Sequence, residues 1–167
     1  MGKEFARTID VAGTPPLRFS NTSSSVELRI LGYQYPENSR DQYDADWLRV
    51  EGIVTHPNGN WRFCDPCLLT WEASALATWL DRWVDSANAQ STIGFIEPNL
   101  SFSRIDSSPG SVLPVSFELE SRPPWAEKRF ADESDFWIDF PLITSGASAA
   151  AQTMRDQLRR FPIRVGP

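Results

Sequence analysis

With 167 residues, the chain is long enough for one domain with a substantial core, and 41% hydrophobic residues with seven Trp exclude a disordered protein. No stretch approaches the run of about 18 apolar residues that a membrane-spanning helix needs, so we expect no membrane partner. Residues 1–25 lack the continuous apolar run of a signal peptide, which predicts a cytoplasmic location.

The net charge of −6 is unevenly distributed along the chain. Residues 155–167 contain four arginines and one aspartate, a local charge of +3, which leaves −9 for the rest. Such an acidic body repels nucleic acid, so we expect no nucleic-acid partner. It favours a basic protein partner, because complementary charge speeds association. Mild acidity that serves only solubility is the alternative interpretation.

The first third of the chain predicts a lead-in, a strand and a long loop. Residues 1–25 mix charged residues, two prolines and a Ser/Thr run, and we interpret them as a loosely ordered lead-in to a single domain over residues 26–167. Apolar and charged residues alternate over 26–30, which is the pattern of a half-buried strand. Residues 35–46 are polar, contain two tyrosines and predict a long loop.

A β-hairpin is predicted next. Asn58-Gly59 between two apolar runs is a strong signal for a tight hairpin turn. Side chains alternate between the two faces of a strand. In the first strand, Leu48, Val50 and Val54 therefore share one face, and Arg49, Glu51 and Thr55 share the other. In the return strand, Trp61 and Phe63 share one face.

Two amphipathic helices are predicted. The first has Thr70 as its N-cap and Glu72 in its first turn, where the helix dipole favours a carboxylate. Its apolar stripe, which we interpret as core packing, consists of Leu76, Trp79, Leu80, Trp83, Val84 and Ala87. The second begins near Ser145 and is stopped by Pro162, and its apolar face consists of Ala147, Ala150, Ala151, Met154, Leu158 and Phe161.

The remaining strands are predicted at 92–96, 100–105, 112–120 and 136–140. Short connections between neighbouring strands imply antiparallel pairing. Each helix has only one apolar face, so the two cannot cover both sides of a large sheet. The predicted fold class is therefore α+β, with a curved, mainly antiparallel β-sheet and two amphipathic helices packed on one side.

The chain offers little chemistry for catalysis. His56, the only histidine, lies beside the predicted turn and is interpreted as solvated, and neither a nucleophile elbow nor a phosphate-binding glycine motif is present. Two groups of acids could bind metal or transfer protons. They are Asp44 with Asp46, and Asp132 with Glu133 and Asp135. Solvated acids without such a role are far commoner. We therefore predict no catalytic residues, no cofactor and no metal.

Cys64-Asp65-Pro66-Cys67 has the spacing of a redox pair. A thioredoxin-like fold would place the pair in a βαβ unit, whereas here it follows a predicted hairpin. Zinc normally takes four protein ligands, more than this segment and one distant histidine provide. We favour reduced structural thiols, and a redox pair or a metal site shared between molecules stays open.

Five short stretches occur in an order that resembles the WapI-type immunity protein family of bacteria. They are Leu28-Arg29-Ile30-Leu31-Gly32-Tyr33-Gln34, Tyr43-Asp44-Ala45-Asp46-Trp47-Leu48, Asp65-Pro66-Cys67-Leu68-Leu69-Thr70-Trp71-Glu72, Glu97-Pro98-Asn99-Leu100-Ser101-Phe102 and Arg122-Pro123-Pro124-Trp125. The resemblance spans about residues 26–161, and the N-terminal 25 residues look longer than is usual in the family. It implies a protein that binds and neutralises a toxin, and it implies no catalytic residues. The namesake's toxin is a nuclease, which would fit a basic partner.

The favoured function is a non-enzymatic immunity protein that covers the substrate cleft of a basic, nuclease-type toxin domain. Large tryptophans mostly serve packing, so we interpret Trp47, Trp71 and Trp125 first as clamps that hold loops on the sheet. The predicted partner-binding residues are Glu37, Asp41, Asp44 and Asp46 in one loop, Trp125 at a proline-bounded turn, and Glu127, Asp132, Glu133 and Asp135 in a second acidic patch. The alternatives are an interaction domain without a toxin partner and a thiol oxidoreductase.

Overall fold

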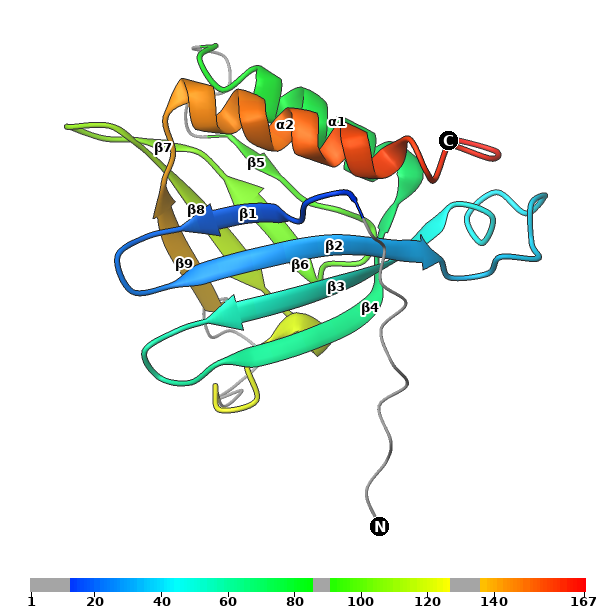
Figure 1. The fold of residues 1–167 in the computed structure, drawn as a ribbon, viewed down its shortest axis with the longest axis horizontal. Coiled ribbons are helices and arrows are strands. Elements are labelled where there is room, and N and C mark those ends of the chain that lie inside the picture. Colours follow the sequence, from blue (N-terminus) through cyan, green and yellow to red (C-terminus); the bar gives the residue numbers. More distant parts are fainter. Residues whose placement is uncertain (1–12, 86–90, 127–135) are drawn as a thin grey trace.

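Two antiparallel β-sheets form the body of the molecule in the computed structural model, which describes residues 13–85, 91–126 and 136–167 (Figure 1). In the first sheet every strand pairs with the next along the chain, and the predicted hairpin joins the last two strands. Its strands are β1 (Leu17–Ser20), β2 (Ser25–Tyr33), β3 (Trp47–Thr55) and β4 (Trp61–Leu69).

The second sheet is built around β8. One edge of β8 pairs with β6 and then with β7, the other edge pairs with β9, and β5 extends the sheet beyond β6. The strand predicted over 112–120 ends earlier and is followed by the 3₁₀ helix η2 (Leu119–Ser121). The strands are β5 (Thr92–Ile93), β6 (Leu100–Ser103), β7 (Ile105–Asp106), β8 (Ser111–Phe117) and β9 (Phe136–Pro141).

The hydrophobic core lies between the two sheets. Phe19 of β1 contacts Phe102 of β6 with ring centroids 6.3 Å apart, and Trp61 of β4 contacts Phe117 of β8 at 5.4 Å. Each sheet has one apolar face, and the two faces remove each other from water. The predicted α+β class with antiparallel strands and two helices is confirmed, and the structure adds that the strands divide into two facing sheets.

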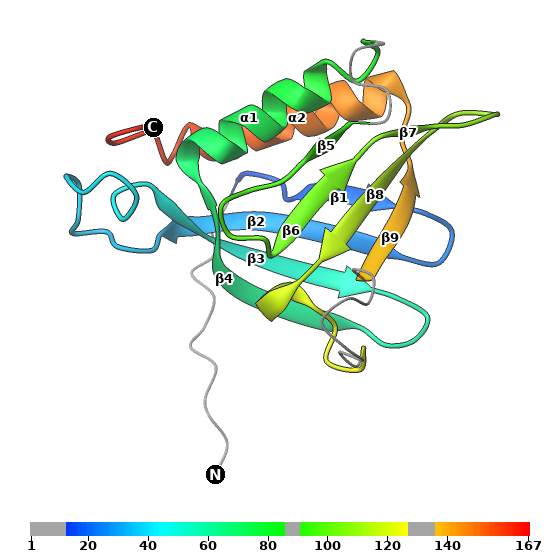
Figure 2. The same ribbon diagram turned by 180° about the vertical axis from the view of Figure 1, so that it is seen from behind.

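Two helices, α1 (Thr70–Asp81) and α2 (Thr144–Leu158), lie side by side along one side of the sheets (Figures 1 and 2). The alanines predicted on one face of α2 are buried and leave room for the close approach of α1. An ion pair between Arg155 of α2 and Asp81 of α1 also joins the helices. This pair neutralises one of the arginines that make the C-terminal segment basic.

The apolar stripe of α1 is confirmed at three positions. Leu76, Leu80 and Trp83 are buried, and the Trp83 Nε1–H donates to the carbonyl of Leu142 at 3.1 Å. Trp79 is only half-buried, and Val84, which lies beyond the end of the helix at residue 81, is exposed. Ala87, also placed on the stripe, lies outside the described residues.

Two predictions about the ends of elements are corrected. Residues 17–20, assigned to the lead-in, form β1, whose Leu17 and Phe19 are buried in the core. Four residues are too few for a distinctive alternating pattern. Thr70 is the first helical residue of α1 and not its N-cap; the N-cap is Leu69, whose N–H donates to the Glu72 carboxylate at 2.9 Å.

Gly52, in β3, is required by the packing of the hairpin. It stands opposite Phe63 in the register of β3 with β4. A Cβ atom at Gly52 would come within 2.1 Å of the Phe63 ring, so the ring covers the bare backbone. The aromatic side chain of one strand thereby compensates for the missing side chain of the other.

Candidate functional site

The loop over residues 34–46 and the C-terminal segment 162–167 meet at one end of the molecule, which we call the acidic end (cyan and red in Figure 1). The loop connects β2 to β3, and its predicted position is confirmed. The C-terminal segment follows α2 and was not predicted to take part. Two buried or half-buried side chains, Asp46 and Arg164, hold the loop and the segment together.

Asp46 is fully buried, at 0% exposure, and anchors the C-terminal segment. Its carboxylate accepts hydrogen bonds from the Thr70 hydroxyl at 2.6 Å and from the backbone N–H groups of Arg164 and Val165 at 2.8 Å and Gly166 at 3.1 Å. Burial by itself raises the pKa of this carboxyl, but the bonds from Thr70 and from the three backbone groups outweigh burial and hold the pKa below its usual value of 3.8. The carboxylate is thus ionised and fully used within the fold.

This position corrects the interpretation of Asp46 as a partner-binding acid. A carboxylate at 0% exposure cannot reach a partner without unfolding its surroundings. Sequence reasoning placed it with its exposed neighbours because acids in polar loops are usually solvated. The donors that bury it come from residue 70 and from residues 164–166, far along the chain.

Arg164 holds the loop from the other side. Its guanidinium donates to the carbonyls of Tyr35 at 3.1 Å, Pro36 at 3.1 Å and Asn38 at 2.7 Å. It also lies over the ring of Tyr33, with its central carbon 3.5 Å from the ring centroid. A single arginine therefore bonds three loop carbonyls, of which that of Tyr35 also accepts the N–H of Asn38 at 3.1 Å, and its guanidinium makes a cation–π contact as well.

The surface of the acidic end carries acids and tyrosines. Glu37, Asp41 and Asp44 are exposed, as predicted for a partner-binding loop. Tyr35 and Tyr43 are about half exposed beside them, at 46% and 49%. Within the loop, Asp41 accepts a hydrogen bond from the Asn38 side chain at 2.8 Å. The loop is thus internally bonded and presents its acids in a defined arrangement.

Part of this surface was not predicted from the sequence. Ile163 and Val165 of the C-terminal segment are exposed, and they add apolar area next to the acids. The local charge of +3 near the C-terminus was the available signal, but it indicated only a basic tail. In the structure Arg155 and Arg159 form ion pairs with Asp81 and Asp156.

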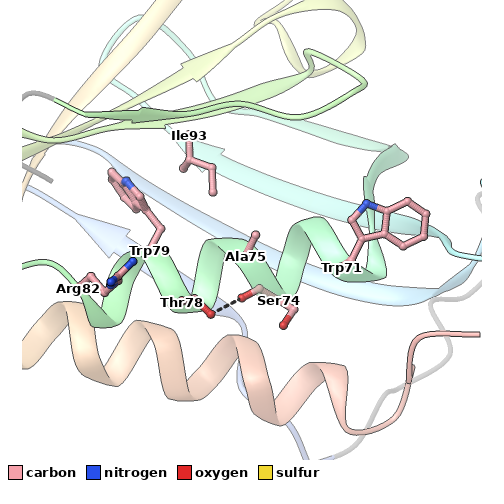
Figure 3. Close-up of a pocket in the computed structure, with 7 residues that line it drawn as sticks. All are labelled: Trp71, Ser74, Ala75, Thr78, Trp79, Arg82 and Ile93. Atoms are coloured by element: carbon pink, nitrogen blue, oxygen red, sulfur yellow. Dashed lines mark hydrogen bonds between the residues drawn. The ribbon is translucent and has the colours of Figure 1, made fainter. Parts of the chain in front are cut away.

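A groove along α1 continues from the acidic end (Figure 3). It has a volume of about 510 Å³, and its lining residues are Trp71, Ser74, Ala75, Thr78, Trp79, Arg82 and Ile93. Trp71 closes the near end of the groove and contacts Tyr43 of the loop with ring centroids 6.2 Å apart. Trp79 lies at the far end, where its Nε1–H donates to Ser91 at 3.1 Å. The exposed face of α1 is therefore continuous with the predicted binding loop.

Trp125 packs over the β3–β4 turn. Its ring stacks on His56 at 5.2 Å and meets Phe136 edge-on at the same separation, and its Nε1–H donates to the Gly59 carbonyl at 3.3 Å. Gly59 has φ of +142°, and a Cβ there would lie 3.0 Å from the Trp125 nitrogen, so glycine is required. The contacts agree with the clamp interpretation of Trp125, and His56, predicted to be solvated, is half-buried.

The second predicted acidic patch cannot be placed. It consists of Glu127, Asp132, Glu133 and Asp135, which lie outside the described residues. Within residues 13–85, 91–126 and 136–167, no three His, Cys, Asp or Glu side chains converge in a way that could hold a metal ion. In the same ranges, no helix is long and apolar enough to cross a membrane.

The two cysteines occupy opposite faces of β4. Cys64 is exposed on the outward face, whereas Cys67 is fully buried on the core side, and both thiols are free. Cys67 is the extra residue of a β-bulge in β4, opposite Leu48 and Arg49, and the bulge turns it into the core, away from the exposed Cys64. Burial raises the pKa of both thiols, above all that of Cys67, which disfavours the reactive thiolate. The burial of Cys67 and the raised pKa of both thiols favour the interpretation as reduced structural thiols.

The half-exposed tyrosines of the acidic end are of a type enriched in protein interfaces, and the acids beside them would complement a basic partner. The chain matches the sequence model of the immunity protein WapI-like family over residues 17–162, and it belongs to this family. The family implies a toxin-neutralising immunity role, and with it a toxin partner and a non-enzymatic mode of action. No curated protein matches the chain.

Proposed function

We propose that the chain acts in the bacterial cytoplasm, where its acidic end binds a cognate toxin domain and covers the substrate cleft of that domain. The observation that carries this proposal is the loop over residues 34–46, which Asp46 and Arg164 hold in place while its acids and tyrosines face outward. A loop that is ordered before binding loses little conformational entropy on association. Half-exposed tyrosines beside it can serve as anchors of the interface.

The charge of the acidic end favours a basic toxin of the nuclease type. Glu37, Asp41 and Asp44 resemble, in charge, the phosphates that a nuclease cleft is built to attract. The same acids repel nucleic acid and anionic membrane surfaces, so neither is proposed as a partner. An interaction domain without a toxin partner is the alternative, and a protection assay separates the two.

The protection assay begins with the neighbouring gene: where it encodes a large secreted protein, the variable C-terminal domain of that protein is co-expressed with this chain. We expect growth to be restored, because the bound immunity protein blocks the toxin's cleft. Normal toxicity in the presence of well-folded protein would favour the interaction domain without a toxin partner.

A charge-reversal experiment then tests the binding surface. Glu37→Lys with Asp44→Lys reverses two exposed loop acids and leaves Asp41 in place, because Asp41 bonds to Asn38 within the loop. The double change raises the net charge from −6 to −2, since each reversal adds two. We expect surface plasmon resonance to show an association rate lowered at least about tenfold at low salt, and less at high salt.

The matched control is Asp85→Lys with Asp139→Lys. Both residues are exposed, the net charge changes equally, and the end of α1 and β9 lie away from the acidic end (Figure 1). This control should leave the association rate within about twofold of wild type. Equal slowing by both pairs would show that only net charge matters. No slowing by the loop pair would remove the acidic end from the interface.

A further inference from the structure

Hydrogen bonds at both ends fix the groove along α1. One wall of the groove is α1, and the other is the segment 91–96, which contains β5 (Figure 3). At the near end the buried Glu72 carboxylate accepts the N–H of Leu69 at 2.9 Å and that of Ile96 at 2.7 Å, so it ties the start of α1 to this segment. At the far end the Trp79 Nε1–H donates to Ser91 at 3.1 Å. The two walls are therefore fixed relative to each other before any partner binds.

The groove offers apolar surface to a partner. Its apolar lining residues are Trp71, Ala75, Trp79 and Ile93. The Thr78 hydroxyl is used within the helix, because it donates to the carbonyl of Ser74 at 3.1 Å (Figure 3). Of the lining residues that the structure describes, only Arg82 is charged, and it forms an ion pair with Asp85 at 3.5 Å. An apolar side chain can therefore enter the groove without separating a charge of the lining from its partner.

Trp71 adds an unused hydrogen-bond donor to the groove. The indole N–H groups of Trp79 and Trp83 donate to Ser91 and to the carbonyl of Leu142. The indole N–H of Trp71 donates to no residue within 13–85, 91–126 and 136–167, and Figure 3 shows its nitrogen on the side of the ring that faces the groove. Tryptophan N–H groups usually find an acceptor when they are buried. A backbone carbonyl of a bound segment would be that acceptor for Trp71.

The near end of the groove opens onto the acidic end of the molecule. The ring of Trp71 contacts the ring of Tyr43. In the loop, Tyr43 lies between the exposed acids Asp41 and Asp44. Ile96 also lies at this end of the groove, where it is 56% exposed and extends the apolar area. A partner that contacts the loop acids therefore finds apolar surface directly beside them.

We propose that the groove binds an extended segment of the cognate toxin, which places one large apolar side chain between Trp71 and Trp79 and basic side chains beside the loop acids. This inference rests on the proposed function and names the chemistry of the toxin surface at the same site. The volume of about 510 Å³ lies within the roughly 300–1,000 Å³ of typical ligand clefts, so a large side chain fits. Hot spots of protein interfaces are large side chains in well-packed pockets. The acids at the mouth favour a segment in which the neighbouring residues are basic.

The loop acids and the groove should act on different rate constants. Long-range attraction by exposed acids speeds association, and salt weakens that attraction. Apolar contacts within a groove form only after the encounter, so they mainly slow dissociation. Burial of one large apolar side chain corresponds to at least about tenfold in affinity. A change confined to the groove should therefore raise the dissociation rate, and it should leave the association rate and its salt dependence unaltered.

Ala75→Gln tests the groove. Ala75 is exposed on α1 between Trp71 and Trp79, so a longer side chain there occupies the space of the incoming side chain (Figure 3). Glutamine is uncharged and a good helix former, so the net charge and α1 should be preserved. We expect surface plasmon resonance against the toxin domain of the protection assay to show dissociation at least about tenfold faster, with the association rate within about twofold of wild type. Ala149→Gln is the matched control, because it makes the same change at an exposed position of α2, and it should behave as wild type.

Hydroxyl-radical footprinting of the wild-type chain gives a second readout that needs no variant. Binding of the toxin domain should protect Trp71 and Trp79 from oxidation, because the bound segment covers both rings. Trp137, which is 50% exposed on β9 and outside the groove, should be oxidised equally with and without toxin. Circular dichroism and a cooperative melting curve establish whether both glutamine variants are folded. Footprinting decides the test if either variant is not.

The outcomes separate this inference from the proposed function. Suppose that the wild type binds the toxin domain. Equal dissociation of Ala75→Gln and Ala149→Gln, or oxidation of Trp71 and Trp79 that binding does not reduce, would then exclude the groove from the interface and leave the acidic end in it. Failure of the wild type to bind the toxin domain would contradict both proposals. Protection of Trp71 when the chain alone is concentrated from about 5 to about 100 μM would assign the groove to a second copy and overturn the inference.

Discussion

Asp46→Ala tests whether one buried carboxylate holds the acidic end together. The change removes the acceptor of the Thr70 hydroxyl and of the N–H groups of residues 164–166. A hydrogen bond to a charged group contributes about 1.5–3 kcal/mol to stability. When such a bond to a surface segment is lost, the freed N–H group can bind water, which offsets much of the lost energy. We count the Thr70 bond in full and the three backbone bonds together as one further bond. The free energy of unfolding should then fall by about 3–6 kcal/mol.

Thermal denaturation followed by circular dichroism measures this loss. About 4 kcal/mol corresponds to a Tm lower by about 8–16 °C for a chain of this size. Asp44→Ala is the matched control, because Asp44 lies two residues away in the same loop and is exposed. The control should change the free energy of unfolding by no more than about 0.5 kcal/mol. Amide hydrogen exchange at residues 164–166 should become fast in Asp46→Ala and stay slow in the control.

The pH dependence of the effect follows from the lowered pKa of Asp46. A carboxyl with a lower pKa in the folded than in the unfolded state stabilises the fold above the unfolded-state value, here 3.8. The difference in the free energy of unfolding between wild type and Asp46→Asn should therefore be greatest near neutral pH. It should disappear as the pH falls below 3.8 through the folded-state pKa. Equal melting of Asp46→Ala and Asp44→Ala at neutral pH would refute the anchoring role.

Three further predictions concern the scaffold. Iodoacetamide near neutral pH should label Cys64 slowly and leave Cys67 unlabelled in the native protein, as mass spectrometry of the digest can show; labelling of both would contradict the burial of Cys67. Trp83→Ala should cost about 3–5 kcal/mol in denaturant unfolding, and Trp79→Ala clearly less because it is half-buried; an equal loss would place Trp79 in the core. Gly52→Ala should cost about 1–3 kcal/mol by the same measurement, because the ring over it must move, and a neutral result would show a loosely packed hairpin.

The local elements of the fold could be predicted because they depend on neighbours in the sequence. The turn at Asn58-Gly59 needs a left-handed residue, and Gly59 supplies it with φ of +142°. Alternation identified the inward faces around it, where Val50, Val54 and Trp61 are buried. Repetition every three or four residues identified the core side of α1. The period of two in strands and of 3.6 in helices follows from backbone geometry alone. Both can therefore be recognised in the sequence without knowledge of any tertiary contact.

The candidate site was only partly predictable for the same reason. Polarity and turn-forming residues indicated an exposed loop over 35–46, and Glu37, Asp41 and Asp44 are indeed exposed. Nothing in the same stretch distinguishes Asp46 from them, because its partners are Thr70 and the backbone of residues 164–166. Contacts between segments so far apart leave no periodic pattern in the sequence.

By itself, the sequence of this protein determined its α+β class, its hairpin, its two amphipathic helices and its membership of an immunity protein family. Only the tertiary structure decided that the strands divide into two facing sheets and that Asp46 is an anchor. An alternating strand reveals which of its faces is apolar. Which surface covers that face depends on chain topology and on the packing of distant segments, and neither is encoded in local periodicity.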